Sequence, residues 1–492
     1  MSIASRVAGR PMVGLVAICL AALMFGLEIS SVPVILPTVG QELRGSFADT
    51  EWIMSGYTIG VVTLLMPAGT LGDRFGHRRV LVLAVTAFGL ASLLCGLAPT
   101  PGWLIAGRVA QGMSGGAMLA CQIALLSHQF PAGPERTRAF GWWGVVFGVG
   151  LGFGPAIGGE ILATLGWQWV FLVHVCVACV VVPLVLLGPA DVRDPRAGRM
   201  DLAGLGTLIL AVVGLTFFIT EGPTIGLTAP LPLAALAVSL VSAVCFVLVE
   251  LRGEAPMIDF RVFRVRAFSG ALFSSAGMNF SFWPLIIYLP VYLQAGLGYS
   301  AGVASVVLLA YTLPTLVLPP VAERLMLRHR PAVIIPAGLA LVGVGLLAVM
   351  AGSMAAQPSW LTVVPGMLVA GIGLGLTNTP TTNTTTASAP SDRSGMASGI
   401  DMTARMTSLA INISLMGLLF AAGVSDQLRR HLPASTDVDA LATRVANGNG
   451  PIDAVASQAL GHATTLVTLY GGVAALVLAV ASRLTFGFRR AR

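Results

Sequence analysis

The sequence contains no lysine, so all 28 of its basic residues are arginines. A phosphate-binding loop of the GxxxxGK[ST] type needs its lysine to reach the phosphates of ATP. A Schiff base with a carbonyl substrate needs a lysine as well. The absence therefore excludes an ordinary ATP-driven motor and Schiff-base chemistry, and any energy that the protein uses must come from another source.

Charge of either sign is also scarce, since only 10% of the 492 residues are charged. A soluble protein carries about 25% charged residues, so this chain has too few to cover a water-exposed surface. Hydrophobic residues make up 56% of the sequence, and the mean hydropathy is +0.87. The net charge of +7 does not indicate nucleic-acid binding, because the arginines lie in short loops between apolar runs. Lipid is therefore the expected solvent for most of the protein.

Long apolar runs fill most of the chain. A membrane-spanning helix needs roughly 20 apolar residues, and a membrane barrel would show short alternating segments instead. The sequence therefore predicts an all-α integral membrane protein with 14 transmembrane helices. The runs cover about residues 12–36, 52–71, 79–98, 103–127, 140–163, 167–188, 201–221, 230–250, 267–294, 302–320, 332–351, 360–380, 398–421 and 464–484.

Most arginines fall on one side of these spans, which the positive-inside rule assigns to the cytoplasm. This asymmetry predicts an even number of spans with both termini cytoplasmic, and the first run is interpreted as a span rather than a cleaved leader. The lack of lysine is typical of a GC-rich bacterial genome, so the predicted location is a bacterial inner membrane. The arginines expected outside are Arg44, Arg429, Arg430 and Arg444.

Two arginine-rich loops divide the chain into three parts. The predicted parts are a six-helix bundle over residues 1–188, two inserted helices with cytoplasmic linkers over 189–266, and a second six-helix bundle over 267–492 with an outer loop at about 422–463. An acid–arginine pair at Asp73 follows the second span, and a similar pair at Glu323 follows the tenth. This echo indicates two pseudo-symmetric bundles that arose by duplication.

The loop after the second run reads Gly-Thr-Leu-Gly-Asp-Arg-Phe-Gly-His-Arg-Arg over residues 69–79. The glycines allow a tight reversal and a close approach of the backbone. Here the sequence resembles the major facilitator superfamily, whose signature loop has this pattern. The resemblance implies conformational gating, in which the charges lock the cytoplasmic faces of the two bundles. The residues concerned are Gly69, Gly72, Asp73, Arg74, Gly76, Arg78 and Arg79.

An arginine, Arg108, lies inside the fourth run, where a charge is costly and needs a partner. Glu28 in the first run lies roughly 12 Å below the outer end of its helix, and Arg108 lies roughly 8 Å below the end of its own. The similar depth predicts that they pair, either for proton coupling or as a purely structural ion pair. Arg108 also matches a second superfamily motif together with Gln111, Gly112, Gly115 and Gly116.

The fifth run contains overlapping GxxxG steps, which let helices approach closely, and a proline that bends the helix. It is similar to the motif that marks the antiporter branch of the superfamily, and simple packing is the alternative interpretation. The motif residues are Gly150, Gly154, Pro155, Gly158 and Gly159. Glu160, which follows directly, is interpreted as a solvated helix end, with a contact to a cationic substrate as the alternative.

The first run resembles the 14-helix drug:proton antiporter family, in which an aspartate, a threonine and an asparagine are usual. Glu28 keeps the acid and Ser30 keeps a hydroxyl, whereas Pro33 replaces the asparagine and His174 stands where the sixth span often has another. Residues 393–405 also fit this family. Within them Asp401 and Arg405 lie four residues apart and are predicted to form a structural pair.

The ninth run mixes aromatic and polar residues, which can stack lipophilic cations in a cavity or simply face lipid and the membrane interface. Our candidates for substrate contact are Asn279, Trp283, Tyr288 and, in the twelfth run, Asn378.

Together these features predict a non-enzymatic, proton-coupled exporter of lipophilic, often cationic, compounds that works by alternating access. The alternatives are a dedicated exporter of a metabolite or self-made antibiotic, and a membrane sensor or scaffold with a transporter fold. Proton-driven uptake is disfavoured by the glycine motif. No cofactor, metal, nucleic acid or ATP is expected. The partners are protons, small lipophilic substrates and the bilayer, and a monomer is favoured over an oligomer.

Overall fold

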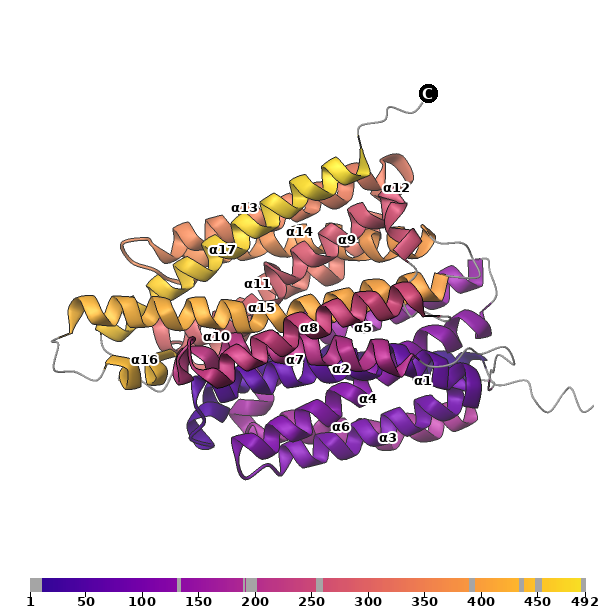
Figure 1. The fold of residues 1–492 in the computed structure, drawn as a ribbon, viewed down its shortest axis with the longest axis horizontal. Coiled ribbons are helices and arrows are strands. Elements are labelled where there is room, and N and C mark those ends of the chain that lie inside the picture. The colour runs from indigo at the N-terminus through magenta and orange to yellow at the C-terminus, as the bar shows by residue number, and fades with distance from the viewer. Residues whose placement is uncertain are drawn as a thin grey trace, which may run out of the picture.

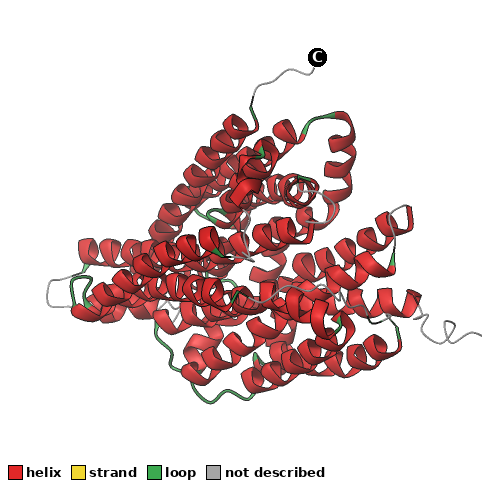
Figure 2. Ribbon diagram, turned by 45° about the vertical axis from the view of Figure 1, so that its right-hand side comes forward, coloured by secondary structure: helices red, strands yellow, loops and turns green. Residues whose placement is uncertain are grey.

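The computed structural model describes residues 11–130, 134–188, 191, 201–253, 260–388, 394–432, 438–446 and 454–487. These residues are almost entirely helical, and the described part contains no strand (Figure 2). The elements are α1 Pro11–Glu42, α2 Phe47–Phe75, α3 His77–Gly96, α4 Pro101–Gln129, α5 Pro134–Leu165, α6 Gln168–Leu187, α7 Leu202–Ile225, α8 Pro230–Arg252, η2 Phe260–Arg264, α9 Arg266–Asn279, α10 Phe282–Val291, η3 Tyr292–Gly296, α11 Ala301–Val317, α12 Pro319–Arg328, α13 Pro331–Ser353, α14 Trp360–Ala387, α15 Ser394–His431, α16 Val438–Ala446 and α17 Ala454–Phe486.

Within the described ranges, 13 helical segments are long and apolar enough to cross a membrane. The 29-residue helix α2 packs along α4 among them and corresponds to the remaining predicted span. The all-α membrane fold predicted from the apolar runs is thereby confirmed. The ninth predicted span is not one straight helix, because α9 ends at Asn279 and α10 begins at Phe282. A break frees backbone carbonyls, and neighbouring helices bond to them here: Asn412 donates to the carbonyl of Asn279 and Tyr311 to that of Phe282.

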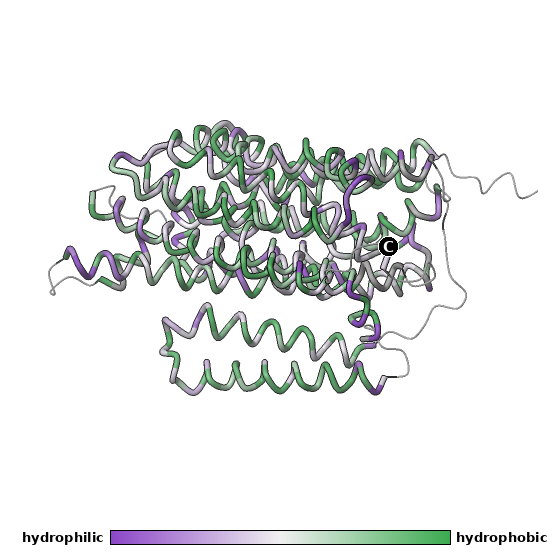
Figure 3. Tube along the Cα trace, turned by 90° about the horizontal axis from the view of Figure 1, so that it is seen from above, coloured by the Kyte–Doolittle hydropathy of each residue, from purple (hydrophilic) through white to green (hydrophobic). Residues whose placement is uncertain are grey.

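The helices form two bundles. In the first, α1 packs on α5 and α6, and α4 packs on α2 and α3. In the second, α13 packs on α14 and α17, while α9 and α15 pack on α17. The bundles meet where α5 lies on α11 and where α2 lies on α15. The hairpin of α7 and α8 lies outside them and contacts α2 and α15 through α7 (Figure 3).

Helix α1 begins and α17 ends at the same end of the molecule, which we call the terminal end; α16 lies at the opposite end, the far end (Figure 1). The largest buried apolar cluster includes the far-end parts of both bundles, such as Leu36 on α1, Tyr288 on α10 and Phe420 on α15. Phe47 on α2 stacks on Phe420, which in turn stacks on Tyr288. The two bundles are therefore packed against each other at the far end.

The segment predicted as an outer loop at about 422–463 is largely helical where it is described. Helix α15 continues to His431, α16 covers Val438–Ala446, and α17 already begins at Ala454. The sequence does not show this extension as an apolar run, because these turns project beyond the most hydrophobic part of each helix and carry polar residues. These helical turns cover the far end of the molecule, where α16 contacts α2.

Glycines bring α5 against α1 with almost no space between the backbones. A Cβ at Gly150 would lie 2.9 Å from the carbonyl oxygen of Leu23 and 2.9 Å from the nitrogen of Leu27. A Cβ at Gly158 would lie 2.8 Å from the Cβ of Ser31. Such close approach is what GxxxG steps provide in membranes.

We predict that Gly150→Val destabilises the protein by about 1–3 kcal/mol, because the new methyl groups would overlap the backbone of α1. Gly144→Val on the same helix is the matched control, since a Cβ there meets nothing within 4 Å. Thermal unfolding of the two purified variants in detergent checks this expectation. Equal unfolding temperatures would contradict it.

Candidate coupling and substrate site

A buried ion pair joins the middle of α1 to α4. The guanidinium Nη1 of Arg108 contacts the carboxylate Oε1 of Glu28, and both side chains are 0% exposed. The depth comparison made from the sequence therefore placed these two residues correctly. A buried charge without a partner costs several kcal/mol, so each group is the reason the other is tolerated.

The position of Arg108 is fixed by three further contacts. Its Nε donates a hydrogen bond to the carbonyl oxygen of Ile53 at 3.0 Å. Its Nη1 also donates to Oε1 of Gln111 at 2.7 Å, and Gln111 in turn donates to Ser92 at 2.8 Å. The guanidinium carbon lies 4.3 Å from the ring centre of Tyr57, a cation–π distance. Arg108 is therefore held by α2 and α4 as well as by Glu28.

Glu28 has a second neighbour in His174 on α6, which is 1% exposed. The imidazole Nδ1 lies 3.5 Å from Oε2 of Glu28 and 3.1 Å from the carbonyl oxygen of Val170. Its Nε2 lies 3.2 Å from the carbonyl oxygen of Met24. Among the described residues, Oε2 of Glu28 and Nη2 of Arg108 have no hydrogen-bond partner. The ion pair therefore leaves one carboxylate oxygen and one guanidinium NH2 group without a hydrogen-bond partner in the described part of the chain.

A small central pocket lies beside this ion pair, between the two bundles. Tyr57 connects the two, because its ring lies under Arg108 and also lines the pocket. The lining is almost wholly apolar, and it comes from α1, α2, α10 and α15. It consists of Ile29, Pro33, Met54, Tyr57, Thr58, Trp283, Ile286, Ile287, Met406, Leu409 and Ile413.

Of the four residues predicted to contact substrate, only Trp283 lines this pocket. Asn279 is 3% exposed and is bonded within the second bundle, donating to Ser275 and accepting from Asn412 at its backbone oxygen. Tyr288 lies closer to the far end and lines a different, smaller pocket. Asn378 accepts a hydrogen bond from the guanidinium of Arg405.

A second intramembrane ion pair lies within the second bundle. Arg405 and Asp401 form the pair expected from their spacing, with Nη2 and Oδ2 3.1 Å apart. Ser275 on α9 donates to Asp401, and Arg405 donates to Thr382 on α14 at 3.1 Å. The pair therefore ties together α9, α14 and α15, as a structural pair would.

The signature loop lies at the terminal end, between α2 and α3. Gly76 has a φ of +103°, which other residues avoid, so the reversal there needs glycine. Asp191, just after α6, accepts from the backbone N–H of Arg78 at 3.2 Å and lies 3.6 Å from Nε of Arg79. The guanidinium of Arg74 lies over the ring of Phe75. These contacts stay within the first bundle, while the side chain of Asp73 lies outside the described part.

Of the remaining loop glycines one lies at a close contact, as do glycines of the fifth-span motif. Gly72 faces the ring of His77, whereas a Cβ at Gly69 meets nothing within 4 Å. Gly154 faces Ser30 of α1, and Gly159 faces Ser305 of α11 in the other bundle. Pro155 lies inside α5 between these contacts, so the motif packs α5 against both α1 and α11.

The structure also buries an acid that no sequence motif indicates. Glu51 on α2 is 4% exposed and accepts a hydrogen bond from Tyr288 on α10 at 3.0 Å. It stands just before the second apolar run, where an acid ordinarily belongs to the solvated end of a helix. Its burial comes from the second bundle, through Tyr288 on α10 and through Ile413 and Gly417 on α15, which are distant in the sequence.

Two helical bundles that meet around an apolar pocket, with a buried ion pair beside it, define a membrane transporter. The chain belongs to the Major Facilitator Superfamily, whose sequence pattern it matches over residues 18–412. It is 31% identical over 418 residues to the multidrug resistance protein Stp of Mycobacterium tuberculosis, covering 85% of this chain and 77% of that protein. It is 30% identical over 430 residues to a tetracenomycin C resistance and export protein of Streptomyces glaucescens, covering 86% of this chain and 78% of that one.

Solved structures show the same fold. A bacterial homologue of the human lysosomal transporter Spinster, in an inward-facing and unoccupied conformation, superposes with a TM-score of 0.63 at 16% identity, with 96% of each chain covered. A peptide transporter, POT, in complex with sulfate superposes with a TM-score of 0.65 at 13% identity, covering 98% of this chain and 97% of that one.

We predict that Arg108→Met destabilises the protein by about 3–5 kcal/mol, because it leaves the Glu28 carboxylate buried without its partner. Adding Glu28→Gln to the same variant removes the orphaned charge and restores most of the loss. Thermal unfolding of the single and double variants in detergent measures the coupling. A double variant no more stable than the single one would show that the pair is not energetically coupled.

Proposed function

We propose that the protein is a proton-coupled exporter of lipophilic compounds, many of them cationic, and that Glu28 and Arg108 couple the proton to the substrate. The observation that carries this proposal is the buried ion pair of Glu28 and Arg108 beside an apolar pocket that both bundles line. A membrane-embedded acid with a free oxygen offers a place for a proton, and the pocket offers one for an apolar substrate. The names of the relatives, which include resistance and export proteins, support the same function.

Coupling between proton and substrate follows from the position of Tyr57, which contacts both Arg108 and the pocket. The affinity of Glu28 for a proton depends on how closely Arg108 approaches it. Tyr57 touches the guanidinium on one side and the pocket on the other. A substrate that enters the pocket presses on Tyr57, alters the contact between Arg108 and Glu28, and so changes the proton affinity. The proton and the substrate then exclude each other, as exchange requires.

The conformational cycle uses both ends of the molecule. We assign the terminal end to the cytoplasm, in line with the arginine distribution, so that the far end faces outward in a bacterial inner membrane. The packing of the two bundles at the far end then corresponds to an inward-facing or occluded state. In the outward-facing state, the signature loop residues from Gly69 to Arg79 would lock the cytoplasmic faces. The three-part division at residues 188 and 266 fits rocking of two bundles around the pocket.

We predict that Glu28→Gln abolishes proton movement on drug addition, because a neutral amide cannot bind and release a proton. Proteoliposomes with an imposed pH gradient and an internal pH dye, challenged with a panel of lipophilic cations and neutral drugs, provide the measurement. Glu160→Gln serves as the control, since that acid on α5 is exposed.

The Glu160→Gln control should move protons on drug addition as the natural protein does. If the Glu28→Gln variant still moved protons, the coupling role of this residue would be wrong. If no compound moved protons even with the natural protein, a sensor with a transporter fold would be favoured.

We predict that Trp283→Ala weakens binding of lipophilic cations by about tenfold, or about 1.4 kcal/mol, because the pocket loses its largest aromatic wall. Phe273→Ala is the matched control, since Phe273 on the preceding helix α9 is 41% exposed and does not line the pocket. Quenching of intrinsic fluorescence or calorimetry on the purified variants gives the dissociation constants. Similar losses in both variants would remove Trp283 from the substrate site.

A dedicated exporter of one metabolite or antibiotic is the second candidate function. The relative from Streptomyces glaucescens, named for resistance to and export of tetracenomycin C, favours it. The same panel of compounds separates the two functions, because a dedicated exporter would respond to one chemical family only. In either case, Glu28 remains the proposed coupling residue.

A further inference from the structure

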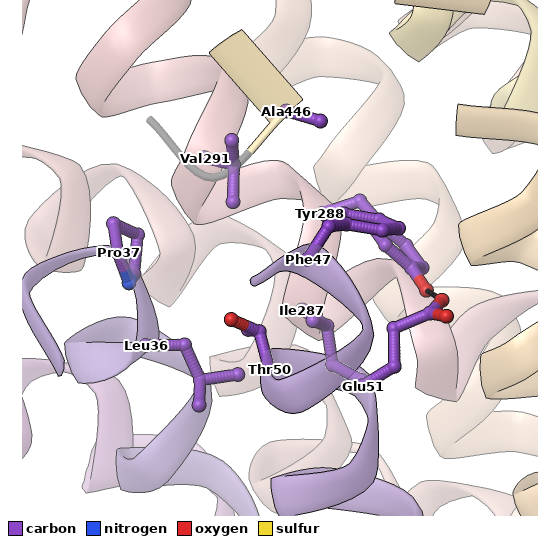
Figure 4. Close-up of a pocket in the computed structure, with 9 residues that line it drawn as sticks. All are labelled: Leu36, Pro37, Phe47, Thr50, Glu51, Ile287, Tyr288, Val291 and Ala446. Atoms are coloured by element: carbon purple, nitrogen blue, oxygen red, sulfur yellow. Dashed lines mark hydrogen bonds between the residues drawn. The ribbon is translucent and has the colours of Figure 1, made fainter. Parts of the chain in front are cut away.

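The far end of the molecule contains a buried acid that the coupling mechanism does not use. Glu51 lies one turn into α2 and is 4% exposed. Its carboxyl group reaches across from the first bundle to the second and points at Tyr288 (Figure 4). The pocket around it is lined otherwise by apolar side chains and one threonine, from α1, α2, α10 and α16. The lining residues are Leu36, Pro37, Phe47, Thr50, Glu51, Ile287, Tyr288, Val291 and Ala446.

The second bundle is shaped to receive this acid. Tyr288 Oη lies 3.0 Å from Oε1 of Glu51 and 2.7 Å from the carbonyl oxygen of Ile413 on α15. Gly417, one turn further along α15, leaves the space that the carboxyl group fills, because a Cβ there would overlap Oε1 of Glu51. The contact therefore connects α2 to both α10 and α15 when the far end is closed.

Counting hydrogens shows which form of Glu51 suits this arrangement. The hydroxyl of Tyr288 has one proton but faces two acceptors, the carboxyl of Glu51 and the carbonyl of Ile413. If Glu51 is ionised, both acceptors compete for that proton. If Glu51 is protonated, it donates to Tyr288 Oη, and Tyr288 donates to Ile413. Every hydrogen then has an acceptor, and no charge is buried.

The charges around Glu51 favour the same form. Among the described residues, no arginine or histidine lies within ion-pair distance of it. The titratable groups that face it are Tyr288 on α10 and Glu221 on α7, and Glu221 accepts a hydrogen bond from Trp52 at 2.9 Å. Ile413 and Gly417 on α15 and Ala446 on α16 carry no charge. A second carboxylate at Glu51 would therefore add repulsion to the cost of burial.

We propose that Glu51 is a proton-operated latch of the far end, which closes by donating a hydrogen bond to Tyr288 when protonated and opens when the proton leaves. An ionised Glu51 gains water only if α2 separates from α10 and α15. Because the closed state binds the proton and the open state releases it, low external pH favours closure and high pH favours opening.

This latch differs from the coupling site in what happens to the proton. The proton of Glu51 enters and leaves from the far side and stays in place while that side is closed, so it is not transported. The proposal rests on alternating access as set out for the proposed function. It adds that external acidity itself returns the protein to the closed state, ready to load substrate from the other side.

The test measures closure of the far end directly. Spin labels at Leu97→Cys and Met354→Cys report the distance between the bundles, since both positions are 65% exposed, one in each bundle, at the far ends of α3 and α13. The native cysteines are removed, and Glu28→Gln is included so that the coupling site does not titrate. Pulsed electron resonance in nanodiscs, from about pH 5 to about pH 8, gives the ratio of long to short distances. This ratio should rise by up to about tenfold per pH unit, the limit for one linked proton.

Glu51→Gln should keep the short distance at every pH, because its amide N–H replaces the carboxyl O–H toward Tyr288. Tyr288→Phe should populate the long distance more at low pH than the parent does, because the protonated acid loses its acceptor. Glu160→Gln, an exposed acid on α5, should respond to pH like the parent.

A pH response unchanged by Glu51→Gln, or no pH response in the parent, would overturn the latch. If Glu51→Gln does not fold, a Tyr288→Phe variant with the same distances as the parent would overturn it instead. These distances do not depend on transport, so failure of the latch leaves proton-coupled export through Glu28 standing. Conversely, failure of the proteoliposome assay does not alter the distances.

Discussion

The ion pair between Glu28 and Arg108 is the interaction on which the rest of the structure depends. Neither charge is tolerable in an apolar interior without the other, and both are fully buried. The surroundings hold the pair in register: Ile53 and Gln111 fix the guanidinium, and the glycines of α5 pack against α1 beside the acid. In a chain with so few charges, this concentration of polar contacts is the reason we propose the pair as the coupling site.

The second constraint is that the two bundles must separate at one end while they close at the other. In this structure the far end is closed by the stacking of Phe47 on Phe420 and by the contact of Glu51 with Tyr288, which in turn donates to Ile413. The charged loop at the terminal end instead pairs with Asp191 inside its own bundle. A transporter with an acid at its centre and another at its outer closure can separate two tasks. In our proposals, Glu28 exchanges a proton for substrate and Glu51 responds to the pH at the far end.

Composition and hydropathy were sufficient to predict the fold class, because lipid imposes helices and fixes their length. Helical depth paired Glu28 with Arg108, and helical periodicity paired Asp401 with Arg405. Sequence could not predict which polar residues face the central pocket. Asn378 is bonded inside its bundle, and only Trp283 of the four candidates lines that pocket, because tertiary contacts decide where a polar side chain turns. Glu51 was missed since its burial comes from helical turns distant in sequence. The division into three parts and the roles of the site residues remain predictions.

Infrared difference spectroscopy tests the central claim most directly, because a protonated carboxyl has its own C=O absorption. Tetraphenylphosphonium, a lipophilic cation, would be added to the purified protein at a pH where Glu28 is protonated in the absence of substrate. The account predicts that one protonated-carboxyl band disappears on binding, and that this change is missing in Glu28→Gln. A band that disappears equally in the natural protein and in Glu28→Gln would show that the substrate displaces a proton from another group, and would contradict the account.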